Sequence, residues 1–481
     1  MQRLLATLVL AAGCGAQIED DGPDGPDQPE PPVAAVCDEA ELPAELSALA
    51  NVTSSREVAC GQYVAAPARC FDVTFRQPIS ATNPATYDQH LLLTHRGCNR
   101  PMVVADWGYS SFGFFDDELA TLFHANTLWL EHRYQGESVP AQAAWDWSAL
   151  TIENGANDTH RVIEQFKTIY GANWVSTGAS KGGITAAYHY YFFPHDLDGS
   201  IPYVAPASRA RVDNEYQSYI TQHMTSSCAQ KIRDTQVAAL TTRHNAMITR
   251  LTASAGAGAE ESYLQSMAGY LDWSFWQYYG NTSCAAVPTS TTTDDNFFAF
   301  LRQASGYPER LPATDARSDG ALSYEWLTEQ GFAQQLSPTV ASYVTDPSAR
   351  MNMEDAFKSQ YPDIALPAYN GQVTRDVRTW AKSADNLLLI YGELDPWSGG
   401  AMDPPTKPSS RRYFVPGANH GAQIAALPTN DRSNALTLAS LYFGEQADVT
   451  ALPRAIAANA HRAELLARAA QYEAVLVNGL R

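Results

Sequence analysis

A tight turn between an apolar segment and a helix-prone segment constrains this chain more than any other stretch. The sequence Asn173-Trp-Val-Ser-Thr-Gly-Ala-Ser-Lys-Gly-Gly-Ile184 begins with strand-forming residues and runs into the helix-prone residues 184–188. Ser180 lies at the apex, and Gly178 and Gly182 lie two positions away on either side. Small residues are needed there because strand and helix backbones nearly touch at such a turn. The pattern predicts a serine hydroxyl lifted out of a sheet.

Apolar stretches on both sides of this turn predict a mainly parallel sheet. Between the strand at 126–131 and the strand before Ser180, residues 158–170 carry apolar side chains on one helical face. The order strand, helix, strand indicates a crossover between parallel strands. The predicted strands are 70–75, 88–95, 100–105, 126–131, 173–178, 198–205, 387–391 and 412–415.

The pattern of apolar and polar residues changes between about residues 208 and 375, where no clear apolar strand is found. Helical patterns such as 228–251 predict an inserted helical cap, which divides the core into residues 37–207 and 376–481, the latter ending in a helix. Within the cap, Trp273 and Trp276 belong to an aromatic run that could line a substrate pocket together with Trp397. The simpler interpretation is that this run forms the small core of the cap itself.

A histidine and a carboxylate follow the late strands in the order that a serine nucleophile requires. Serine needs a base within hydrogen-bond reach, and the base needs a carboxylate that orients it. Asp395 follows the strand at 387–391, and His420 follows the next strand, so both are expected at the same edge of the sheet as Ser180. Asp403 and Glu393 are the competing carboxylates.

Two backbone positions are candidates for stabilising a negatively charged oxygen on the substrate. The N–H of Lys181 begins the helix after Ser180. A second donor is expected from Gly108 or Tyr109, just after a short buried strand. A simple glycine-containing loop explains the second position equally well.

The N-terminus has the features of an export signal. Arg3 precedes an apolar run at 4–12 that ends in Leu10-Ala-Ala-Gly-Cys14, which resembles a bacterial lipoprotein cleavage site with Cys14 as the lipidated residue. Ordinary signal cleavage nearby is the alternative. Residues 15–36 are rich in acidic residues and proline, which predicts a disordered tether.

The remaining six cysteines agree with export, because an even number in an exported chain suggests up to three disulfides. Cys228 and Cys284 are the preferred pair, since both fall inside the cap. No cysteine or histidine cluster has zinc spacing, so neither a metal site nor a cofactor is expected. The net charge of −20 argues against nucleic acid and against electrostatic docking on anionic lipid.

Four motifs taken together resemble the S37 family of serine peptidases, the prolyl tri/tetrapeptidyl aminopeptidase family, over about residues 60–445. They are Thr177–Gly183, Glu131–Ser138, Gly392–Trp397 and Asn419–Gly421. The resemblance implies an α/β-hydrolase fold with a helical cap, in which Ser180 is the nucleophile, Asp395 the carboxylate and His420 the base. It also implies an exported enzyme that releases short peptides from peptide N-termini, often after proline.

Two alternative functions fit the same residues. A capped esterase or lipase would use the same turn and the same three side chains, because these do not distinguish an ester from an amide. A catalytically inactive surface lipoprotein could bind peptides or a partner through the same scaffold. Reaction of Ser180 with a fluorophosphonate would separate an enzyme from the inactive protein.

Overall fold

The computed structural model describes residues 37–255, 258–306, 316–350 and 352–457, which belong to one compact unit, Ala35–Arg481. The predicted signal peptide, Cys14, the acidic tether and most of the predicted C-terminal helix lie outside the described residues. Within them, no helix is both long enough and apolar enough to cross a membrane.

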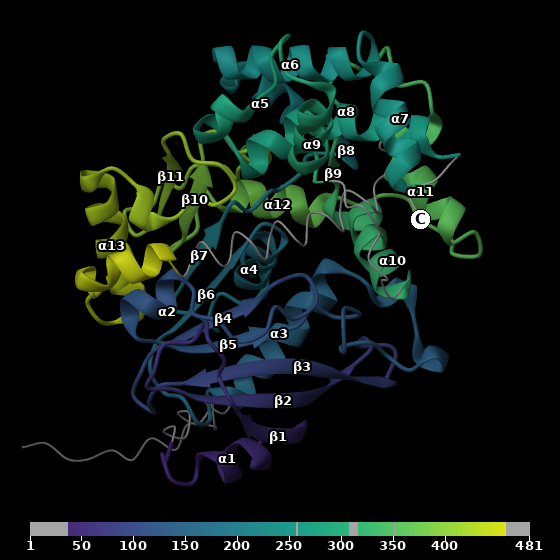
Figure 1. Cartoon of the computed structure of the whole chain (residues 1–481). Coiled ribbons are helices and arrows are strands. Elements are labelled where there is room, and N and C mark those ends of the chain that lie inside the picture. The colour runs from purple at the N-terminus through teal and green to yellow at the C-terminus, as the bar shows by residue number, and fades with distance from the viewer. Residues whose placement is uncertain (1–36, 256–257, 307–315, 351, 458–481) are drawn as a thin grey trace, which may run out of the picture. The chain divides into compact units, whose positions relative to one another are not determined.

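A nine-stranded mixed sheet runs through the described residues (Figure 1). Neighbouring strands follow the order β1-β2-β3-β5-β4-β6-β7-β10-β11. The strands from β5 to β11 pair in parallel, whereas β1, β2, β3 and β5 pair antiparallel with one another along the first part of that order. The bounds are β1 Val52–Val58, β2 Arg69–Pro78, β3 Thr86–His95, β4 Met102–Asp106, β5 Asn126–Leu130, β6 Trp174–Ala179, β7 Gly199–Tyr203, β10 Leu388–Gly392 and β11 Arg411–Val415.

Helices cover both faces of this sheet because its central strands are apolar on both sides. In β4, Met102 and Val104 pack into one core cluster, and Val103 and Ala105 pack into another. The first cluster includes α1 (Leu42–Ala48), α3 (Ile152–Phe166), α4 (Lys181–Phe192) and α12 (Gln372–Trp380). The second includes α2 (Glu118–Phe123) and α13 (Thr429–Phe443). The predicted mainly parallel α/β architecture is therefore confirmed.

A group of helices is inserted between β7 and α12, and Figure 1 shows α5 to α9 gathered together. Two short parallel strands, β8 (Val212–Asp213) and β9 (Phe332–Ala333), pair the beginning of this insertion with the segment that follows α10, a pairing that the sequence did not predict. A buried cluster that includes Trp273 and Trp276 packs these helices together and extends to core residues such as Tyr87, Tyr109 and Trp397. The helices are α5 Glu215–His223, α6 Ser227–Leu240, α7 His244–Ala255, α8 Glu260–Tyr278, α9 Asp294–Ala304, α10 Ala316–Glu325 and α11 Met353–Gln360.

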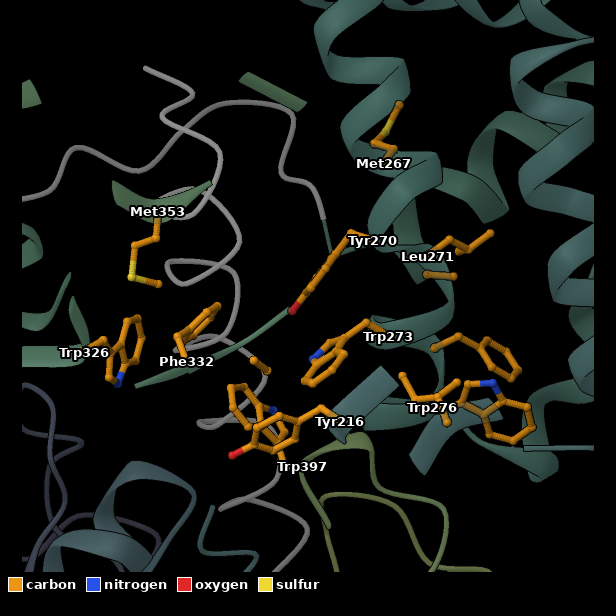
Figure 2. Close-up of a cluster of buried hydrophobic side chains, with 14 of the residues drawn as sticks. Tyr216, Met267, Tyr270, Leu271, Trp273, Trp276, Trp326, Phe332, Met353 and Trp397 are labelled. Carbon is orange, nitrogen blue, oxygen red and sulfur yellow. The ribbon is translucent and has the colours of Figure 1, made fainter. Parts of the chain in front are cut away.

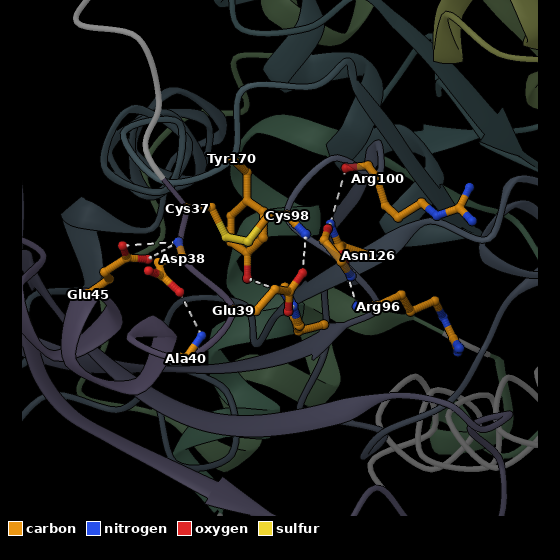
Figure 3. The surroundings of a disulfide bond; sticks show 12 residues. Cys37, Asp38, Glu39, Ala40, Glu45, Arg96, Cys98, Arg100, Asn126 and Tyr170 are labelled. Carbon is orange, nitrogen blue, oxygen red and sulfur yellow. Dashed lines mark hydrogen bonds and ion pairs between the residues drawn. A yellow bond between two sulfur atoms is a disulfide. The ribbon is translucent and has the colours of Figure 1, made fainter.

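Three disulfides join the six cysteines of the described part of the chain. The predicted pair Cys228–Cys284 is confirmed, and Cys37–Cys98 and Cys60–Cys70 close the first segments of the core. Figure 3 shows the carboxylate of Glu39 beside Cys98, whose backbone N–H it accepts at 2.9 Å. Glu39, His95 and Cys98 are near enough to one another to ligate a metal ion, but the sulfur of Cys98 is committed to the disulfide. Among the described residues, only Glu39 and His95 remain as donors there, whereas a zinc site uses three or four protein ligands.

Candidate active site

Ser180 occupies a strained turn between β6 and α4. Its backbone has φ 59° and ψ −126°, a left-handed conformation that non-glycine residues rarely adopt. A Cβ atom on Gly178 would lie 2.3 Å from the carbonyl oxygen of Gly182, and one on Gly182 would lie 2.9 Å from the Cα of Trp107. Neither position accepts a larger residue without a backbone shift. The glycine spacing in the sequence therefore has the steric cause that was predicted for it.

The loops after β10 and β11 bring Asp395 and His420 into contact. His420 Nδ1 lies 2.7 Å from Asp395 Oδ2, and both side chains are buried. The second oxygen of Asp395 accepts the backbone N–H of Trp397 at 3.1 Å, which fixes the carboxylate at the start of a short 3-10 helix, Pro396–Gly400. A carboxylate held on Nδ1 leaves Nε2 as the acceptor that a general base needs.

The competing carboxylates are engaged elsewhere. Asp403 forms an ion pair with Lys382 at 3.0 Å, and Glu393 accepts the backbone N–H of Gly417 at 2.7 Å. Neither interaction involves the ring of His420, so Asp395 is the carboxylate that orients it.

Ser180 lines a small cavity whose free volume is about 20 Å³, roughly the space of one water molecule. Trp397 forms part of its wall and also contacts the ring of His420, with the two ring centres 6.4 Å apart. No hydrogen bond joins His420 Nε2 to Ser180 or to any other described residue. Such bonds commonly tighten only when substrate binds. The wall side chains must also move apart before an acyl group can enter.

The three predicted pocket tryptophans have different positions. Trp397 lines the cavity of Ser180. Trp273 is fully buried behind it, with the two rings edge to face at 5.1 Å, and does not line the cavity (Figure 2). Trp276 lines a separate cavity with Met224. The alternative interpretation of the aromatic run, a core of the insertion, therefore describes Trp273 and Trp276 better than a substrate pocket does.

Side chains that the sequence did not single out complete the wall of the Ser180 cavity. Trp326 and Gln330 come from a π-helical turn, Trp326–Gln330, that directly follows α10. Phe332 of β9 contacts both Trp326 and Trp397, with ring centres 4.8 and 5.8 Å apart (Figure 2). The residues that line the cavity are Tyr109, Ser180, Lys181, Ile184, Pro206, Ser208, Trp326, Gln330, Gly331, Phe332 and Trp397.

Of the candidate oxyanion donors, Lys181 and Tyr109 line the cavity with Ser180. The N–H of Gly108 is donated to Asp106 Oδ1 at 2.8 Å, so it is not directed at a substrate oxygen in this structure. Of the two candidates after β4, Tyr109 is the one that lines the cavity with Ser180. Gly108 has φ +76°, and a Cβ there would lie 2.7 Å from Cγ of Lys181, which explains why the loop contains glycine.

A chain of four buried charged side chains lies directly beside the turn. Lys181 Nζ lies 2.8 Å from Glu325 Oε2, and the other oxygen of Glu325 lies 2.9 Å from His132 Nε2. His132 Nδ1 in turn lies 2.8 Å from Asp106 Oδ2. Burial alone lowers the pKa of His132, but the carboxylates of Asp106 and Glu325 outweigh burial and raise this pKa to about 9. Burial raises the pKa of Glu325, yet Lys181 and His132 lower it to about 2.

The motif Glu131–Ser138 supports this region rather than facing the cavity. The carboxylate of Glu131 accepts the backbone N–H groups of Ser111, Glu137 and Ser138, each at 2.8 Å. It thereby joins the loop after β4 to the loop after β5. A buried carboxylate with several backbone donors is a common way to fix two loops.

A strand-to-helix turn with a strained serine, in a mainly parallel sheet with a His–Asp pair on later loops, defines an α/β-hydrolase. The chain belongs to the peptidase S37 family: the family model described as PS-10 peptidase S37 matches residues 60–474. It is therefore a serine-type peptidase.

The chain is similar to two relatives and to one solved structure. It is 30% identical to a prolyl tri/tetrapeptidyl aminopeptidase of Streptomyces mobaraensis, over 76% of this chain and 78% of that protein. It is 23% identical to a lysosomal Pro-X carboxypeptidase of Bos taurus, over 79% of this chain and 83% of that protein. The solved proline iminopeptidase of Mycobacterium smegmatis aligns with 76% of this chain and 97% of its own, with 15% identity and a TM-score of 0.33.

Proposed function

We propose that this protein is an exported serine exopeptidase that releases tripeptides or tetrapeptides from peptide N-termini after proline. The contact between His420 Nδ1 and Asp395 Oδ2 at 2.7 Å, in a chain whose strained Ser180 lines a cavity, is the observation that carries the proposal. It supplies an oriented base, and the relative at 30% identity is named for the corresponding activity.

In this mechanism the oxygen of Ser180 attacks the carbonyl carbon of the scissile bond, and His420 Nε2 takes the hydroxyl proton. Asp395 stabilises the imidazolium that forms. The backbone N–H groups of Lys181 and Tyr109 hold the oxyanion. His420 then gives the proton to the leaving amine, which departs and leaves an acyl-enzyme. A water molecule, deprotonated by His420, attacks the acyl carbon, and return of that proton to Ser180 frees the peptide acid.

The cavity wall suits an apolar residue next to the scissile bond. Trp326, Phe332 and Trp397 present aromatic surface beside Ser180, against which a proline ring can pack. No acidic side chain lines this cavity among the described residues, so the substrate's α-amine is held farther away. Three extended residues span at most about 10 Å, which is the separation that release of a tripeptide requires.

Export is supported by the cysteines. Three disulfides within the described residues require an oxidising compartment for their formation. The predicted signal peptide and the lipid attachment at Cys14 would supply the route and a membrane anchor.

The function is tested with an Ala-Ala-Pro amide, offered with a free or a blocked amine to wild type and to Ser180→Ala. We expect wild type to cleave only the free-amine substrate and the variant to cleave neither. Cleavage of the blocked substrate at an equal rate would contradict an aminopeptidase. Hydrolysis of a short acyl ester without hydrolysis of either amide would favour the esterase alternative.

A further inference from the structure

We propose that Glu325 is a positioning residue: its carboxylate ties the insertion to the nucleophile turn and to the loop after β4, and so sets the reactive geometry of Ser180. This inference rests on the proposed role of Ser180 as nucleophile. Glu325 does not line the cavity, so it would act through the residues it holds.

Glu325 is the last residue of α10, and the segment that directly follows it supplies part of the cavity wall. Trp326, Gln330, Gly331 and Phe332 all follow it within seven positions and all line the cavity. One oxygen of its carboxylate lies 2.8 Å from Lys181 Nζ, directly after the nucleophile. The side chain of Glu325 thus connects the segment after α10, which supplies part of the cavity wall, to Lys181 beside the nucleophile.

The other carboxylate oxygen of Glu325 reaches the loop after β4 through His132. His132 Nε2 lies 2.9 Å from Glu325 Oε1, and its Nδ1 lies 2.8 Å from Asp106. Asp106 also accepts the N–H of Gly108, and the backbone N–H of His132 donates to the carbonyl of Tyr109 at 3.0 Å. The loop that contains the candidate oxyanion donor is therefore held by the same chain of contacts.

Asp106, His132, Glu325 and Lys181 form a charged set in which each side chain pairs with the next. The four side chains are only 2–5% exposed, so water screens them little. With His132 protonated, two cations alternate with two carboxylates, and the set is neutral. Without the charge of Glu325, the two cations Lys181 and His132 would be balanced only by the carboxylate of Asp106. One buried positive charge would then be uncompensated, which is unfavourable.

Neutralisation by Lys181 and His132 also argues against a different role for Glu325. A carboxylate that binds the substrate's amine must exchange water for that amine, whereas Glu325 already faces two buried cations. Its contacts instead connect the insertion to the turn at Ser180 and to the loop after β5.

The test compares Glu325→Gln with a matched control, Glu329→Gln. Glu329 lies one turn later in the same segment, and its carboxylate accepts the backbone N–H of Ile152 at 2.7 Å. The glutamine side chain can keep that bond through its oxygen. A second variant, Glu325→Gln with Lys181→Met, removes the ion pair between these two residues but leaves the paired charges of His132 and Asp106. It therefore separates an effect on folding from an effect on positioning.

Three quantities are measured for each variant: the second-order rate constant for fluorophosphonate labelling of Ser180, kcat for the free-amine Ala-Ala-Pro amide, and Tm. A misplacement of about 1 Å near a reacting centre can reduce the rate about 100-fold, which is the loss expected for Glu325→Gln in labelling and in kcat. Glu329→Gln should stay within about 3-fold of wild type. The double variant should regain Tm and keep the slow labelling.

Labelling of folded Glu325→Gln at the wild-type rate would overturn the inference. So would a double variant that regains both Tm and labelling, because the charged set would then serve folding alone. If Glu325→Gln does not fold, the double variant decides the question by the same criterion. Wild type that labels but leaves the amide intact would contradict the proposed substrate instead, and the labelling comparison would still stand.

Discussion

Replacement of Asp395 by asparagine should reduce kcat about 10⁴-fold while leaving the fold intact. In the structure one carboxylate oxygen accepts from His420 Nδ1 at 2.7 Å and the other accepts the N–H of Trp397 at 3.1 Å. An asparagine has a single acceptor oxygen. If that oxygen keeps the N–H of Trp397, the amide NH₂ faces Nδ1 and forces it to be an acceptor. The proton of the neutral ring then resides on Nε2, which can no longer accept the proton of Ser180.

The expected loss follows from the wrong tautomer and the missing negative charge, which together cost about 10⁴-fold in comparable sites, or about 5 kcal/mol of transition-state stabilisation. The assay is kcat for the free-amine Ala-Ala-Pro amide, with circular dichroism as a check on folding. Asp403→Asn is the matched control, because Asp403 lies on the same stretch and pairs with Lys382. A folded Asp395→Asn variant with kcat within about 10-fold of wild type would refute this account of the His–Asp pair.

Three further outcomes are expected. Gly178→Ala should lower the free energy of unfolding by about 1–3 kcal/mol from overpacking alone, measured by denaturant titration, because the new Cβ would lie 2.3 Å from a carbonyl oxygen; an unchanged midpoint would contradict the described turn. Loss of the Cys228–Cys284 disulfide, which spans 56 residues, should cost about 4 kcal/mol. Loss of Cys60–Cys70, which spans 10 residues, should cost about 3 kcal/mol. A lower Tm without Cys60–Cys70 than without Cys228–Cys284 would count against the loop-length argument. His132 has a pKa raised to about 9, so its contribution to stability is complete below its unfolded pKa of about 6.5 and is lost as pH rises through 9; Tm measured from pH 6 to 10 should fall more steeply in wild type than in His132→Gln.

The sequence predicted the central strands and the approach of Asp395 to His420 because both follow from local pattern and chain order. Apolar runs define the strands, and parallel strands bring their following loops to one edge. The edge strand β1 was missed, since Val52–Val58 is mostly polar and exposed on both faces. Helix α3 begins at Ile152, six residues before the predicted start, because Thr151 caps it by accepting the N–H of Asn154.

The wall of the cavity and the charged set could not be predicted in the same way. Residues Leu264–Gln277 of α8 are buried without interruption, so periodicity does not tell whether any face of this helix meets the cavity. The aromatic composition therefore allows two interpretations of Trp273 and Trp276, the wall of a substrate pocket or, more simply, a core of the insertion. Glu325 is one acidic residue among many in a helical segment, and its contacts with Lys181 and His132 join positions far apart in the sequence. Such polar pairings leave no repeating pattern along the chain.

The measurement that tests the central claim most directly is the hydrolysis of the free-amine and blocked Ala-Ala-Pro amides by wild type and by Ser180→Ala. The account predicts release of the intact tripeptide from the free-amine substrate alone, and no release by the variant. Tripeptide release by a folded Ser180→Ala variant at the wild-type rate would contradict the assignment of Ser180 as the nucleophile.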